Sequence, residues 1–267
     1  MLMEYSAVEE TKESFALQAK PPQIEIYEDN YVARFAQTKA EIDAVLKLRF
    51  EIFNLELAEG LDTSFQTGRD EDEFDATCHH LLIIEKETNQ IVGTYRLQTR
   101  EIATRGFYSA KEFDLSHLPT GVLEQSLELG RACIAQAHRS PQVLFLLWKG
   151  LAAYLLQARK RYMFGCCSLT SQDANEGKAV MKLLEEGDHL HKDLYVPPQK
   201  GFECFAADFA GNESVQANIP KLFKIYLRYG AKVCGPPAID RMFKTIDFFV
   251  IFDLALLDNI SRAFFGV

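Results

Sequence analysis

The sequence lacks the cysteine patterns that mark a disulfide-stabilised or zinc-binding chain. It has six cysteines, but no two of them form a C-x-x-C pair, and the histidine pairs His79–His80 and His189/His191 have no matching ligand spacing. It also lacks a hydrophobic leader, because the N-terminal stretch MLMEYSAVEETKESF is charged throughout. We therefore expect a reduced, cytoplasmic protein with no metal site.

Positive charge and long apolar runs are scarce as well. The chain has 29 Lys and Arg against 38 Asp and Glu, and its net charge of −9 argues against a broad electrostatic contact with nucleic acid. No apolar run reaches the roughly 18 residues of a transmembrane helix, and the run over 143–156 is interrupted by Lys149. With 48% hydrophobic residues the chain can still bury a full core, so we expect a soluble globular protein.

The pattern of helices and strands predicts one α/β domain. We expect a tail over residues 1–28, because KPPQ at 20–23 breaks any helix, and a single domain over 29–267 without repeats or linkers. Thr38 is predicted to cap a helix over 39–57. The other predicted helices cover 109–113, 143–156, 175–186 and 219–229, and the predicted strands cover 31–37, 81–85, 91–98, 127–134, 162–169 and 245–253.

A charged pair interrupts the predicted strand 127–134. Glu128 and Arg131 are three residues apart, so a regular strand would point them to opposite faces. Both could reach one site only if the strand bulges or splays at Gly130. A surface ion pair at a sheet edge is the alternative, but the apolar neighbours indicate a buried strand, where an unpaired charge is costly. The pair therefore favours a functional site.

The loop after this strand contains no glycine, although it precedes a long helix. Loops that hold the pyrophosphate of coenzyme A are usually glycine-rich, because only bare backbone lets two phosphates lie close. Here Arg139, Ser140 and the amides of Gln142 and Val143 could hold a single phosphate at the helix N-terminus. This favours the phosphopantetheine of a carrier protein over coenzyme A. The alternative is a capped helix that contacts only water.

Five pieces of the sequence occur in an order that resembles the GNAT-type N-acyltransferases that use acyl-carrier protein (ACP). They are LRFEIF at 48–53, DEFD at 72–75, GTYRL at 93–97, ELGR at 128–131 and the strand–loop–helix after it. With CHHLL at 78–82 and LLWKG at 146–150, they are most similar to the lyso-ornithine-lipid synthases, often labelled hemolysin-like, and more distantly to acyl-homoserine-lactone synthases. The resemblance implies a GNAT-like α/β (α+β) fold, with a mixed central sheet and flanking helices.

The resemblance also implies roles for the charged strand. An acceptor ammonium must lose a proton before it attacks a thioester, so Glu128 suits a general base, directly or through one water, with Arg131 as its catalytic partner. Backbone amides of Ala132, Cys133 and Ile134 are natural donors to the thioester oxygen as it gains negative charge. In GNAT proteins the splay at this point receives the pantetheine arm.

Further substrate-binding residues follow from the same likeness. Arg49, Phe53 and Arg96 match acyl-site positions, and the two arginines could either hold an acidic acceptor group or pair with Asp72 and Asp75. The two aspartates lie in a loop that the likeness places over the acceptor, with a solvated acidic loop as the alternative. His80 is either a second proton carrier or a ring that hydrogen-bonds within the fold.

The predicted reaction moves a long, 3-hydroxylated acyl chain from ACP to the α-amine of an amino acid such as ornithine, with glycine, serine or lysine left open. No bound cofactor is expected, since the acyl-phosphopantetheine thioester is a co-substrate. We expect its chain in a tunnel lined by the helix 143–156 and the strand 248–252. The alternatives are acyl-homoserine-lactone synthesis from S-adenosylmethionine and a CoA-dependent N-acyltransferase.

The sequence also leaves open a cysteine-nucleophile enzyme, a non-enzymatic binding module and a membrane contact. Cys133 and His138 could form a cysteine-nucleophile site, although a cysteine in an apolar strand is usually inert. A carrier-protein or lipid-binding module without chemistry is the non-enzymatic alternative. The segment 258–267 could make a peripheral contact with an anionic membrane, or it could pack as a final helix on the domain.

Overall fold

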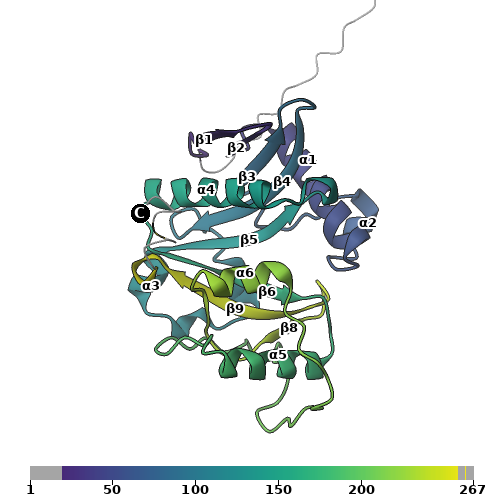
Figure 1. The fold of residues 1–267 in the computed structure, drawn as a ribbon, viewed down its shortest axis with the longest axis vertical. Coiled ribbons are helices and arrows are strands. Elements are labelled where there is room, and N and C mark those ends of the chain that lie inside the picture. The colour runs from purple at the N-terminus through teal and green to yellow at the C-terminus, as the bar shows by residue number, and fades with distance from the viewer. Residues whose placement is uncertain (1–19, 258–261, 263–267) are drawn as a thin grey trace, which may run out of the picture.

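The described strands form one mixed sheet. The computed structural model describes residues 20–257 and 262, and its nine described strands follow the order β1-β2-β3-β4-β5-β6-β9-β7, with β8 also paired to β9 (Figure 1). All neighbours are antiparallel except β5 and β6, which are parallel. The strands are β1 (Glu25–Glu28), β2 (Tyr31–Phe35), β3 (His79–Glu85), β4 (Gln90–Thr99), β5 (Ser126–Ile134), β6 (Tyr162–Leu169), β7 (Lys232–Val233), β8 (Ala238–Asp240) and β9 (Thr245–Asp253).

Helices flank this sheet as the sequence predicts. Thr38 caps the first helix in a capping box with Glu41, and that helix continues directly into a π-helical segment, η1 (Glu51–Glu56). The α-helices are α1 (Lys39–Phe50), α2 (Ser64–Thr67), α3 (Thr120–Glu124), α4 (Pro141–Gln157), α5 (Ala174–Glu186) and α6 (Lys221–Arg228). The 3₁₀ helices are η2 (Tyr108–Lys111), η3 (Leu115–His117), η4 (Gln136–His138) and η5 (Leu254–Leu256).

The core has apolar layers on both faces of the sheet. Along β3, Leu81 and Ile83 pack in the cluster that contains α4, whereas Leu82 and Ile84 pack in the cluster that contains α1. Because side chains alternate along a strand and both faces are covered, the run 81–84 is apolar without interruption. Strand β9 follows the same rule. Its Phe248, Val250 and Phe252 join the cluster of α4, α5 and α6, while Phe249 and Ile251 join Phe107 and Phe113, which flank η2, and Leu115 of η3.

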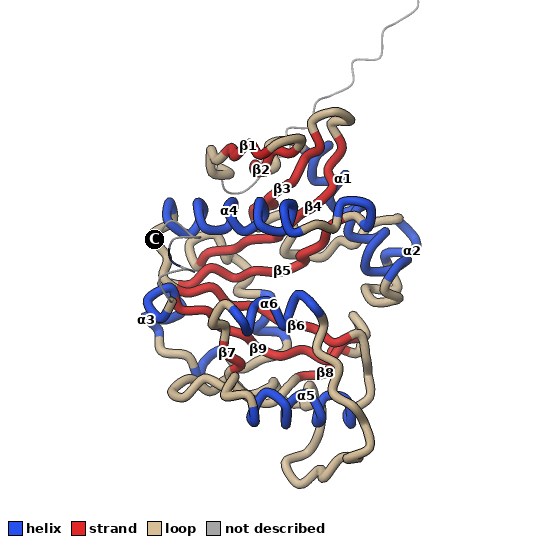
Figure 2. Tube along the Cα trace, in the orientation of Figure 1, coloured by secondary structure: helices blue, strands red, loops and turns tan. Residues whose placement is uncertain are grey.

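The two halves of the sheet part at its centre. Strands β5 and β6 pair only over Ser126–Glu128, opposite Tyr162–Phe164, and then separate (Figure 2). Gly165 stands at the point of separation, where an added Cβ would lie 2.3 Å from the Leu129 carbonyl oxygen. On the other side of β5 the register with β4 shifts near Gly130, and Arg131 adopts a left-handed φ of 53°. The predicted bulge and splay of this strand are therefore confirmed.

Some boundaries differ from the sequence-based predictions. The predicted tail over 1–28 is too long, because β1 occupies Glu25–Glu28 and pairs with β2. Strands β7 and β8 are too short to leave a periodic pattern. The region 202–209 forms a single bridge, from Glu203 to Ala238. Residues 1–19 and the predicted membrane-contact segment, apart from Arg262, lie outside the described residues. In the described chain, no helix has the length and apolar character needed to span a bilayer.

Candidate active site

A cavity of about 360 Å³ occupies the gap between β5 and β6. Its walls include residues 129–132 of β5 and 163–168 of β6. Residues from α4, α6, β9 and the segment after α1 complete it. The parting of the two strands leaves backbone groups of β5 facing this space instead of a neighbouring strand.

One half of the cavity is apolar. Helices α4 and α6 and strands β6 and β9 supply its lining, which includes Trp148, Leu151, Met163, Leu222, Phe223, Tyr226, Tyr229, Val250 and Phe252. The helix 143–156 and the strand 248–252, which were predicted to line the acyl tunnel, both contribute to this wall, and the position of the acyl chain stays a prediction. This lining also contains two tyrosines, Tyr95 and Tyr226. Their hydroxyl groups hydrogen-bond to each other.

The other half of the cavity is polar and contains carboxylates. Its lining includes Glu59, Tyr108, Arg131, Ser168, Thr170, Thr245 and Asp247. Asp247 accepts hydrogen bonds from Ser168 and, at 2.8 Å, from Thr245. Burial raises the pKa of Asp247 above its usual value. Phe53, predicted as an acyl-site residue, lines the cavity and packs edge-on against Phe243 at 5.6 Å between ring centroids.

Arg131 is the cation of the polar half. Its guanidinium carbon lies 4.7 Å from the ring centroid of Tyr108 and 4.2 Å from that of Phe243. Behind these rings its Nη2 donates to Asp72 at 3.2 Å, and its Nε lies 3.2 Å from Asp70 Oδ2. Aromatic faces and carboxylates together fix the direction of this side chain.

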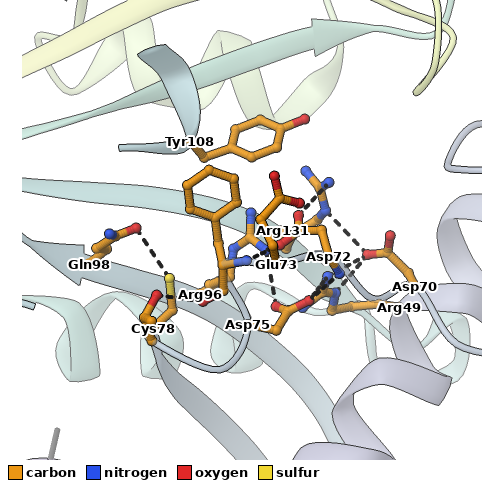
Figure 3. A network of polar contacts seen from close by, with 12 residues as sticks. Arg49, Asp70, Asp72, Glu73, Asp75, Cys78, Arg96, Gln98, Tyr108 and Arg131 are labelled. Atoms are coloured by element: carbon orange, nitrogen blue, oxygen red, sulfur yellow. Dashed lines mark hydrogen bonds and ion pairs between the residues drawn. The ribbon is translucent and has the colours of Figure 1, made fainter. Parts of the chain in front are cut away.

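Three arginines and three aspartates form one buried network beside the cavity (Figure 3). Arg49 donates to Asp70 at 2.7 Å and to Asp75 at 2.6 and 3.2 Å. Arg96 bridges Asp72 at 2.6 Å and Asp75 at 3.0 Å. Of the two roles left open for Arg49 and Arg96, pairing with aspartates is the one observed, and neither arginine lines the cavity.

The loop carboxylates and His80 also belong to this network rather than to the cavity wall. Burial would raise the pKa of Asp75, but the charges of Arg49 and Arg96 hold it well below its usual range. His80 lies 3.0 Å from the Asp75 carbonyl oxygen through Nε2, and burial lowers its pKa to about 4. Of the two roles left open for His80, the ring bonded within the fold is the one observed, while the placement of Asp72 and Asp75 over the acceptor stays a prediction.

Glu128 points away from the cavity. Its two carboxylate oxygens accept the backbone amides of Tyr108, at 2.8 Å, and Ser109, at 2.7 Å. Burial raises its pKa, and hydrogen bonds from Ser109 and Tyr108 oppose that effect. Glu128 is not among the cavity-lining residues, so the geometry gives this carboxylate a role in holding η2 and does not support the predicted role as base.

The predicted phosphate-binding groups have partners within the protein. Arg139 pairs with both oxygens of Glu56, the Nη2–Oε2 contact being 2.7 Å, and Gln142 donates to Asp29 at 2.6 Å. The Ser140 hydroxyl accepts the Val143 amide at 3.3 Å and so caps α4. A phosphate at this place would have to exchange with these contacts, and its binding there stays a prediction.

The predicted amide donors divide into two groups. Ala132 lines the cavity, whereas Cys133 and Ile134 return to pairing with Thr94 and Gly93 of β4. Burial raises the pKa of the Cys133 thiol to about 12, which keeps it protonated near neutral pH. His138 lies 3.0 Å from the Tyr31 hydroxyl. These contacts give no support to a cysteine-nucleophile mechanism.

Sequence reasoning missed Glu59 and Asp247. Asp247 is an isolated charge inside the apolar strand TIDFFVIFD, a signal that could have identified it, whereas nothing local marks Glu59. Asp247 lies close to two further carboxylates, those of Glu112 and Asp240. One oxygen from each of the three groups lies within 4.8 Å of the other two. Burial, followed by the charges of Asp247 and Asp240, raises the pKa of Glu112 well above its usual value.

Comparisons with known proteins agree with this architecture. Residues 48–149 match the family profile described as an acetyltransferase (GNAT) domain. A Rhizobium meliloti protein named L-ornithine N(alpha)-acyltransferase is 30% identical over 250 residues, covering 89% of this chain and 84% of its own. A Brucella abortus protein of the same name is 32% identical over 246 residues, covering 87% and 88%.

The solved structures that resemble this chain include two synthases. FeeM, an N-acyl amino acid synthase from uncultured soil microbes, is 12% identical with a TM-score of 0.49, covering 87% of this chain and 93% of its own. The AHL synthase LasI is 15% identical with a TM-score of 0.47, covering 86% and 93%.

The mixed sheet and the matched profile define a GNAT acyltransferase fold, which confirms the predicted fold class. The chain belongs to the family of the L-ornithine N(alpha)-acyltransferases, as the sequence resemblance implies. It is an N-acyltransferase.

Proposed function

We propose that this N-acyltransferase moves a long acyl group from ACP to the α-amine of ornithine and releases N-acyl ornithine. The observation that carries the proposal is a single cavity with an apolar half and a carboxylate-lined half, joined where β5 and β6 part. The two substrates differ in the same way, because an acyl chain is apolar and a dibasic amino acid is positively charged. The names of the relatives, L-ornithine N(alpha)-acyltransferase, support ornithine as the acceptor.

The reaction requires the thioester carbonyl to lie at the junction of the two halves. There the backbone of residues 129–132 faces the cavity, and the Ala132 amide is a candidate donor to the carbonyl oxygen as the amine adds. The α-ammonium loses a proton, its nitrogen attacks the carbonyl carbon, and the carbon–sulfur bond breaks. The second nitrogen proton neutralises the leaving thiolate, so the products are amide, carrier thiol and one proton.

The apolar half suits the acyl chain. Its aromatic and aliphatic lining would bury methylene groups at about 0.8 kcal/mol each. The paired hydroxyls of Tyr95 and Tyr226 give this half one polar spot, which supports a 3-hydroxyl on the chain because a hydroxyl buried among apolar groups needs a partner.

A positively charged stripe supports ACP as the donor. Lys221, Lys224 and Arg228 are exposed and three or four residues apart, so they share one face of α6. None of them pairs with a carboxylate within the described residues. The same helix lines the cavity through Phe223 and Tyr226, so an acidic carrier bound to this stripe would lie beside the cavity.

An assay with purified protein tests the proposal. We expect rapid amide formation from 3-hydroxyacyl-ACP and ornithine, slower reaction with lysine, and little with glycine or serine. Mass spectrometry of the product identifies the acceptor. Equal turnover of acyl-ACP and acyl-CoA would contradict the carrier claim, and formation of an acyl-homoserine lactone from S-adenosylmethionine would contradict the ornithine claim.

A further inference from the structure

A strained segment after α1 presents one carboxylate, Glu59, to the cavity. We propose that Glu59 receives the acceptor's α-ammonium and takes its proton, as the general base of the transfer. This inference rests on the proposed function, because it assumes an amine acceptor in the polar half. Glu59 is 6% exposed. It lines the cavity, whereas Glu128 does not.

The backbone around Glu59 is irregular. Helix α1 gives way to the π-helical turns of η1, and the flanking residues Ala58 and Gly60 adopt left-handed φ angles of 55° and 79°. An added Cβ at Gly60 would lie 2.6 Å from the Asn54 side-chain oxygen, so glycine is needed there. Such π-helical turns and left-handed residues are costly and gather at functional sites.

Hydrogen bonds hold this irregular segment in place. The Glu59 amide donates to the Phe53 carbonyl at 2.8 Å, and the Gly60 amide donates to the Phe243 carbonyl at 3.0 Å. Phe53 and Phe243 both line the cavity, so the segment is fixed to the cavity wall itself. The direction of the Glu59 side chain therefore follows from the fold.

Glu59 differs from Glu128 and Asp247 in having one carboxylate oxygen without a donor among the described residues. The Thr170 hydroxyl donates to Oε1, and no described residue donates to Oε2. Glu128 instead accepts two backbone amides, and Asp247 accepts two hydroxyls. Burial raises the pKa of Glu59, which moves a carboxylate towards the range suited to a base.

The chemistry balances with one carboxylate. The ammonium transfers one proton to Glu59 Oε2, and the free nitrogen pair then attacks the thioester carbon. The thiolate that leaves takes the second nitrogen proton, and Glu59 returns its proton to solvent after the amide has left. Arg131 also lines the cavity, where it is a natural partner for the carboxylate of the amino acid.

The test compares Glu59→Gln with Glu51→Gln, a matched control that removes the same charge from an exposed residue of the same segment. At pH 7, kcat/KM for ornithine should fall about 10²- to 10⁴-fold in Glu59→Gln and stay unchanged in the control. The deficit should shrink as the pH passes about 8, where more of the α-amine is already neutral. The KM for the acyl donor should not move.

Glu59→Asp serves as a second variant, because its shorter side chain still carries a carboxylate. We expect this variant to keep a base but to show a shifted acid limb in its pH–rate profile. Thermal melting of each variant reports folding separately. A Glu59→Gln protein that keeps wild-type rates, or whose deficit is the same at every pH, overturns the role of Glu59. If Glu59→Gln does not fold, an unshifted profile in Glu59→Asp overturns it. Absence of turnover by the wild type with ornithine would instead overturn the proposed function.

Discussion

At the scale of single residues, Glu128 shows how a carboxylate in a family motif can act through structure. Its hydrogen bonds from Tyr108 and Ser109 fix η2 against β5, and Tyr108 in turn lies under the Arg131 guanidinium. The carboxylate thereby connects the strand bulge to the polar half of the cavity. These contacts give Glu128 a structural role, and its role as the base stays a prediction.

Glu128→Gln should therefore lower stability more than it alters chemistry. The amide keeps the shape but presents a donor to one backbone N–H, which costs about 1–3 kcal/mol in the free energy of unfolding. Urea titration measures this loss. The acid limb of the pH–rate profile should remain where it is in the wild type. If that limb disappears while the protein stays folded, Glu128 is the base after all.

Asp75→Asn tests the buried network. Removing one charge from Asp75 leaves Arg49 and Arg96 under-compensated and should cost about 3–5 kcal/mol, whereas Asp208→Asn at an exposed position should cost little. Because the arginines lower the pKa of Asp75 below its unfolded value of about 3.9, its contribution is fully present above about pH 4 and declines as the pH falls further.

Urea unfolding of wild type and Asp75→Asn at a series of pH values provides the measurement. The difference between their free energies of unfolding should be constant from about pH 8 to pH 5 and should narrow below about pH 4. A difference that widens on acidification would show that the pKa of Asp75 is raised in the folded protein.

At the scale of elements, α6 has two faces with different tasks. Phe223 and Tyr226 face the cavity, and Lys221 and Lys224 face solvent. A donor that binds the outer face is therefore only one helix away from the space for its acyl chain. The cost of holding three like charges on one helix is small if an acidic partner offsets it.

Reversing two of these charges should weaken the carrier and spare the chemistry. For Lys221→Glu/Lys224→Glu we expect the KM for acyl-ACP to rise at least tenfold, most strongly at low salt, with kcat and the KM for acyl-CoA unchanged. Lys86→Glu/Lys182→Glu, with the same charge change at other exposed positions, is the control. An equal effect on both donors, or in both double variants, would contradict docking at α6.

At the scale of the whole molecule, the sequence predicted most elements because their signals are local. The N-cap at Thr38, the apolar run of β9 and the long apolar α4 each depend on neighbours in the chain, and the structure confirms all three. The spacing of Glu128 and Arg131 indicated a bulge at Gly130 only if both side chains reached one site; the register shift is present, although only Arg131 lines the cavity.

The partners of charged residues were less predictable. Asp75 follows Arg49 by 26 residues and precedes Arg96 by 21, so only the folded sheet decides that these arginines bind aspartates and not the acceptor. Glu59 lies between two residues with left-handed φ angles, one of which is the non-glycine residue Ala58. No periodic pattern in the sequence predicts such a turn. Likewise, β1 is too short to be recognised from its sequence alone.

The central claim is that one cavity joins a thioester-bound acyl chain to the α-amine of ornithine. The most direct measurement supplies cells that overproduce the protein with ornithine carrying a heavy isotope at its α-nitrogen, and then analyses the lipid extract by mass spectrometry. An N-acyl ornithine that retains the label in its amide should appear, and it should be absent from cells with the empty vector. An extract with no N-acyl amino acid above that background, or with the acyl group on the side-chain nitrogen, would contradict it.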